Sequence, residues 1–136
     1  MLLRTLHEFE IIGVFDRGIP NTERIVIRVK EQIQLTNYLL MLGIPVGENH
    51  AIPLNFDVFW FGDDILDPLT WIFIYTGPGQ RRITTLNNTN DPAVVMHWGK
   101  RNTILNNENI TPVLVSIEGV LVAPHQEYLS IQDRKT

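Results

Sequence analysis

Hydrophobic and polar residues alternate along much of this chain, and the clearest alternation covers residues 24–35. Ile25, Ile27 and Val29 share one parity there, while charged and amide side chains occupy the other. A helix would place its apolar residues three and four positions apart, so a period of two favours a strand. We therefore predict one long strand over 24–35, with one face toward a core and the other toward solvent.

Two further segments change parity next to a glycine. The apolar residues of 5–15 switch phase just before Gly13, and those of 113–122 switch phase around Gly119. Such a change is typical of a β-bulge, in which one extra residue is inserted into a strand. Both segments are predicted to be long strands that bend at their glycine.

The densest hydrophobic stretch covers residues 56–75 and holds two strand-like runs, 56–61 and 71–75. Both runs are apolar on both parities, so each needs cover on two faces. The turn residues of 76–80 predict a hairpin that pairs 71–75 with 82–86. Residues 93–98 predict another strand.

One short helix is predicted over residues 36–42, with Thr36 as the N-cap and Gly43 as the stop signal. The segment 43–53, with two prolines and two glycines, is the longest predicted loop. Long loops in compact domains are often binding elements.

About eight or nine strands at this spacing indicate one all-β domain over residues 1–136. We predict an antiparallel β-sandwich or barrel, jelly-roll or immunoglobulin-like, with at most one short helix. A chain of 136 residues is long enough to bury a core without disulfides.

Composition and charge narrow the class of partner. Hydrophobic residues make up 44% of the chain and charged residues 19%, and the net charge is −4. A negative protein is not attracted to phosphate backbones or to anionic lipid, so we expect neither nucleic acid nor a membrane as partner. Because Glu8 and Glu10 interrupt the apolar start of the chain, no signal peptide is predicted and a cytoplasmic location is expected.

The chain has no cysteine, so a metal ion could be held only by His, Asp or Glu. The best candidates are Asp63, Asp64 and Asp67, because calcium takes carboxylate oxygens from flexible loops. Aspartates also start turns and accept hydrogen bonds from nearby amides, and this structural interpretation is the favoured one. No cofactor is predicted.

The aromatic residues offer a candidate ligand site. His97 and Trp98 close an apolar strand and, with Trp60 and Trp71, could form a stacking platform for a sugar or another flat ligand. The other interpretation, which we favour, is that these side chains simply fill the core, because they lie in very apolar runs.

No catalytic motif stands out, so the favoured prediction is a non-enzymatic structural or interaction module. It would self-associate through a β surface as a homo-oligomer, with 56–75 as the interface and other proteins of a larger assembly as further partners. One alternative is a protein that binds a small, carbohydrate-like ligand. A metal-dependent β-barrel enzyme is the less favoured alternative.

Overall fold

The computed structural model describes residues 4–48, 50–54 and 57–124. Over these ranges the chain forms eleven strands, one turn of 3-10 helix and no α-helix, which confirms the all-β prediction. No helix in the described part is long and apolar enough to cross a membrane.

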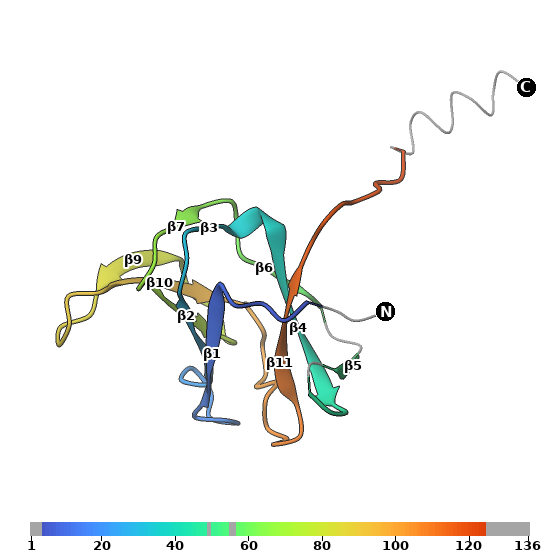
Figure 1. Ribbon diagram of the computed structural model, residues 1–136. Helices are drawn as coiled ribbons and strands as arrows, with labels where there is room; N and C mark the ends of the chain where they lie inside the picture. Colours follow the sequence, from blue (N-terminus) through green and yellow to red (C-terminus); the bar gives the residue numbers. More distant parts are fainter. Residues whose placement is uncertain (1–3, 49, 55–56, 125–136) are drawn as a thin grey trace, which may run out of the picture.

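The strands form three sheets (Figure 1). The five-stranded sheet has the order β1 (Phe9–Phe15), β2 (Arg24–Val29), β8 (Trp71–Tyr75), β10 (Pro92–His97) and β9 (Arg82–Thr85). The four-stranded sheet has β11 (Thr111–Ser116), β4 (Tyr38–Pro45) and β5 (Ala51–Pro53), with β6 (Phe59–Trp60) also pairing with β4. A two-stranded ribbon joins β3 (Ile33–Gln34) to β7 (Ile65–Leu66).

The five-stranded sheet is mixed, because β8 and β10 run parallel. The predicted hairpin between 71–75 and 82–86 is therefore wrong: β10 lies between β8 and β9 and pairs with both. Burial explains this order. All four residues of β9 are exposed, whereas four of the six in β10 are buried. The more apolar strand takes the inner place and the polar strand forms the edge.

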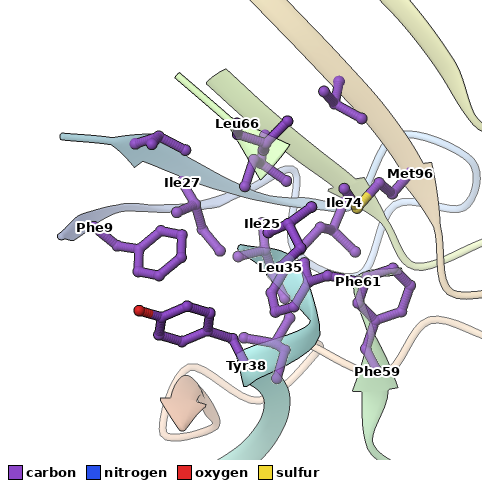
Figure 2. Close-up of a cluster of buried hydrophobic side chains, with 14 of the residues drawn as sticks. Phe9, Ile25, Ile27, Leu35, Tyr38, Phe59, Phe61, Leu66, Ile74 and Met96 are labelled. Atoms are coloured by element: carbon purple, nitrogen blue, oxygen red, sulfur yellow. The ribbon is translucent and has the colours of Figure 1, made fainter. Parts of the chain in front are cut away.

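The core lies between the two larger sheets. Alternate residues of β2, among them Ile25 and Ile27, are fully buried, and so are Leu40 on β4 and Phe61 just after β6. Figure 2 shows Ile25, Ile27, Ile74 and Met96 from the five-stranded sheet gathered with Leu35, Tyr38, Phe59 and Phe61. The period-two pattern thus gives each sheet one apolar face, and the two faces share one cluster.

Two sequence predictions are wrong near the start of the four-stranded sheet. The strand predicted over 24–35 ends at Val29, and β3 belongs to the separate ribbon. The helix predicted over 36–42 is instead a 3-10 turn, Leu35–Asn37, followed by β4. Because the burial of β4 alternates and β4 pairs with β5, β6 and β11, tertiary pairing overrides the short capping signals.

The two predicted bends at glycine have different outcomes. The register of β1 against β2 shifts between Ile11 and Gly13, which confirms the bulge there. The strand predicted to continue through Gly119 is wrong, because β11 ends at Ser116 and the following residues leave the sheet.

None of the three sheets closes on itself within the described residues, so the barrel alternative does not hold there. Their strand order does not establish a jelly-roll or immunoglobulin-like topology. The expected count of eight or nine strands was also too low, because β3, β5 and β7 lie in segments predicted as loops or as part of a longer strand, and β4 was predicted as a helix.

Candidate functional site

The outer face of the five-stranded sheet carries a row of aromatic residues on β8. Trp71, Phe73 and Tyr75 are half-buried, and the rings of Trp71 and Phe73 stack with centroids 6.3 Å apart. Val26 and Val95, their neighbours on the flanking strands, are buried between these larger side chains. We call Trp71, Phe73, Tyr75 and the adjacent His97 the aromatic face.

Arginine side chains already cover much of this face. The guanidinium of Arg28 lies 4.5 Å from the centroid of the Trp71 ring and 3.6 Å from Asp91. Asp91 also accepts a hydrogen bond of 3.3 Å from the Trp71 indole nitrogen. Arg24 contacts the rings of Phe15 and Tyr75 at 5.5 and 5.9 Å. These cation–π contacts occupy ring surface that a flat ligand would need.

His97 lies at one end of the aromatic face, stacked on Tyr75 with centroids 5.5 Å apart. Its Nδ1 is buried and has no hydrogen-bond partner within the described residues. The turn that follows β8 closes over the ring: a Cβ added to Gly79 would lie 2.3 Å from the imidazole Cε1. Only glycine therefore fits between this turn and His97.

The other two residues of the predicted ligand site lie elsewhere. Trp98 packs against the core, with its ring 5.5 Å from that of Phe59. Trp60 is on β6 in the four-stranded sheet and is 59% exposed. The structure thus brings Trp71 and His97 onto one face but does not bring Trp60 and Trp98 to them.

The three aspartates of the predicted metal loop all contact protein groups. Asp64 forms an ion pair with Arg81, the Asp63 carbonyl accepts a hydrogen bond from Gln34, and the Asp67 carboxylate accepts one from Gln32. No three His, Asp or Glu side chains of the described residues are close enough to hold a metal ion. These contacts join the turn to the side chains of Arg81, Gln34 and Gln32, rather than to the nearby backbone amides that the structural interpretation named.

Glu23, which sequence reasoning missed, is the most heavily bonded carboxylate of the described residues. It is 1% exposed and accepts hydrogen bonds from the amides of Gly18, Ile104 and Leu105 and from the Thr76 hydroxyl, at 2.6–3.0 Å. One sequence signal was available: Glu23 has the parity of the core-facing residues of β2. Glu23 therefore fastens three loops to the start of β2.

A groove of about 960 Å³ lies between β1 and β11, which stand at the edges of the two larger sheets (Figure 1). Its apolar walls include Phe9 and Ile11 from β1 and Val113, Leu114 and Val115 from β11.

A polar cluster fastens the entry to β1 to the other sheet. Arg4 donates hydrogen bonds of 3.1 and 3.3 Å to the Glu8 carboxylate, which also accepts a 2.6 Å bond from the Tyr38 hydroxyl. The bond from Arg4 is the main reason that the pKa of Glu8 is lowered to about 2. Burial, followed by the bond to Glu8, raises the pKa of Tyr38 to about 12.

The residues after β11 form an extended segment, 118–124, that we call the arm. Figure 1 shows it leaving the end of β11 and running away from the rest of the chain. Val120 and Val122 are each 81% exposed and Leu121 is fully exposed. Sequence reasoning placed these residues in one strand with β11, with a change of parity around Gly119.

Comparison with known proteins gives this chain no family: no family model, no curated protein and no solved structure matches it. We therefore infer function from the groove and the arm.

Proposed function

We propose that this protein is a non-enzymatic structural module that self-associates through a β surface. The observation that carries the proposal is the arm, in which the three consecutive aliphatic side chains of Val120, Leu121 and Val122 are exposed. We also propose that the two larger sheets are the two halves of an open β-sandwich.

Burial of the arm would supply a useful part of an association free energy. Covering an aliphatic side chain contributes about 1.5–3 kcal/mol, so Val120, Leu121 and Val122 together offer roughly 4.5–9 kcal/mol before ordering costs. A micromolar complex requires about 8 kcal/mol. Main-chain hydrogen bonds formed by the arm would add to this sum.

The rest of the surface offers further apolar contacts. Ile44, Val46 and Ile52 in and near β4 and β5 are at least 40% exposed, as is Trp60 on β6. The sequence-based interface, 56–75, includes Trp60, whereas its first residue, Phe56, lies outside the described residues. We propose that these side chains extend the contact between subunits, with other proteins of an assembly as further partners.

The test is the molar mass of the full chain in solution, measured by light scattering after size exclusion over a range of concentrations. We expect a mass above the 15.6 kDa of one chain that increases with concentration. A mass of one chain at every concentration up to about 100 µM, well above a micromolar dissociation constant, would refute self-association.

A second candidate function is the binding of a flat, carbohydrate-like ligand on the aromatic face. It is favoured by the row of half-buried rings and by the unpaired Nδ1 of His97. The arginines over Trp71 and Tyr75 count against it, since a ligand would have to displace them. Titration with oligosaccharides should quench Trp71 fluorescence if this candidate is right. An unchanged spectrum at millimolar sugar would exclude it for the sugars used.

A further inference from the structure

We infer that the arm of one copy inserts as an additional strand between β1 and β11 of a second copy. This inference rests on the proposed self-association and names the segment and the surface that carry it.

The first argument is that the groove is bordered by two unpaired strand edges. Within the described residues, β1 pairs only with β2, and β11 pairs only with β4. The two edges belong to different sheets and line the same groove. A strand placed between them could bond to both and join the two larger sheets.

Hydrogen bonds show which main-chain groups of β11 face the groove. The Ile117 amide donates a 2.7 Å bond to the Asn37 carbonyl, so the odd-numbered residues before it also bond to β4. The even-numbered residues, Pro112, Leu114 and Ser116, turn their main-chain groups outward. Pro112 has no amide hydrogen. Because its main-chain groups point away from β4, this proline removes no hydrogen bond between β11 and β4.

The same reasoning applies to β1. The Lys30 amide donates a 2.8 Å bond to the Glu8 carbonyl, so the main-chain groups of Glu8 and Glu10 face β2. Phe9 and Ile11 therefore direct their main-chain groups to the groove before the bulge begins. In the described part of the chain, no strand pairs with these outward edges of β1 and β11.

The groove also matches the arm in size and polarity. Its volume of about 960 Å³ leaves room for a peptide segment rather than for a single ion. Phe9, Ile11, Val113 and Val115 present apolar surface to it. The arm supplies two residues that favour strands, Val120 and Val122, and Pro124 limits how far pairing can continue.

The path of the arm favours a second copy over its own groove. The arm continues outward from the end of β11, and no atom lies within 4 Å of a Cβ built on Gly119. Glu118, the first residue of the arm, lines its own groove, but residues 120–122 could enter that groove only by a reversal near Gly119, whereas exchange between copies keeps the extended path. Reciprocal exchange closes a dimer and buries both arms.

Cysteine trapping tests this arrangement directly, because the chain has no native cysteine. Leu121→Cys places a thiol on the arm, Ser116→Cys places one on the groove edge of β11, and Thr85→Cys places one on the distant edge strand β9. Each variant is purified alone, and pairs are mixed under mild oxidation. We expect the Leu121→Cys and Ser116→Cys mixture to give at least about tenfold more mixed disulfide than Leu121→Cys with Thr85→Cys, because bridged Cα atoms must lie within about 7 Å. Equal yields would overturn the inference.

A charge substitution supplies an independent readout. Leu121→Asp should raise the dissociation constant at least about 100-fold, since a buried leucine is lost and a carboxylate must be desolvated. Ile83→Asp is the matched control: Ile83 is 74% exposed on β9, so the same change there should alter the constant less than about threefold.

The outcomes separate the inference from the proposed function. A wild-type chain that is monomeric refutes both. A wild-type oligomer that Leu121→Asp leaves intact refutes arm insertion and leaves self-association through another surface standing. Because Leu121 is fully exposed, loss of folding does not confound the result.

Discussion

Replacing Glu23 with alanine should lower the free energy of unfolding by about 4 kcal/mol. The carboxylate accepts four hydrogen bonds from four different residues, and each bond to a charged group contributes about 1.5 kcal/mol or more. The gross loss is therefore about 6 kcal/mol. Water that enters the vacated space restores part of it.

Glu23→Gln should cost less, about 2 kcal/mol, for a reason that the geometry specifies. With the amide nitrogen placed at the Oε2 position, the Thr76 hydroxyl can rotate to accept a bond, but the Ile104 amide cannot. In the opposite orientation the amides of Gly18 and Leu105 would both face a donor. The first orientation leaves one donor unsatisfied rather than four.

The assay is urea unfolding followed by tryptophan fluorescence, with Glu10→Ala as the control. Glu10 is exposed on β1, so its replacement should change stability by less than about 0.5 kcal/mol. The reasoning fails if Glu23→Ala lies within about 1 kcal/mol of this control, or if Glu23→Gln is as destabilising as Glu23→Ala.

Four further predictions concern other sites. The depressed pKa of Glu8 should stabilise the protein by about 1–2 kcal/mol above pH 4.5, and this contribution should disappear as the pH falls toward 2. The figure allows for the screening of exposed Arg4 by water. The raised pKa of Tyr38 affects stability at alkaline pH, where stability should be lost as the pH rises from 10 to 12. In urea titrations, Tyr38→Phe should abolish this loss. If the variant still loses stability over this range, another group is responsible. Gly79→Ala should destabilise the protein by about 2 kcal/mol in the same assay, because the added Cβ overlaps the His97 ring. Gly119→Ala is the control and should leave stability unchanged, because the space around Gly119 is open. Equal effects of the two substitutions would contradict the packing of Gly79 on His97. Arg28→Ala should expose Trp71 and raise its quenching by acrylamide, and an unchanged quenching constant would mean that Arg28 does not shield the ring.

Local patterns predicted the features of the fold that depend on neighbours in sequence. The bulge before Gly13 was predicted because parity changes there, and β8, β10 and β11 fall in segments whose alternation or apolarity predicted strands. The turn and cap signals at Thr36 and Gly43 were misleading, because either residue is also compatible with the ends of a strand. Pairing partners distant in sequence decided that β4 is a strand.

The candidate sites were harder to predict because they depend on which strands become neighbours. Nothing local indicates that β10 inserts between β8 and β9, and this insertion places His97 beside Tyr75. The groove likewise requires β1 and β11, about a hundred residues apart, to stand at adjacent edges. A lone glutamate after a turn is usually solvated, so the parity of Glu23 was the one sequence signal that its side chain is buried.

The position of β10 has a consequence for how this chain folds. The edge strand β9 has β10 as its one neighbour in the described part of the sheet, although it follows β8 along the chain. β9 forms an antiparallel hairpin with β10 across residues 86–91, and this hairpin joins the rest of the sheet only when β10 closes a loop of about sixteen residues onto β8. Parallel closures of this kind are slow relative to hairpins. We expect hydrogen exchange during refolding to protect the amides bonded between β9 and β10 before those bonded between β10 and β8.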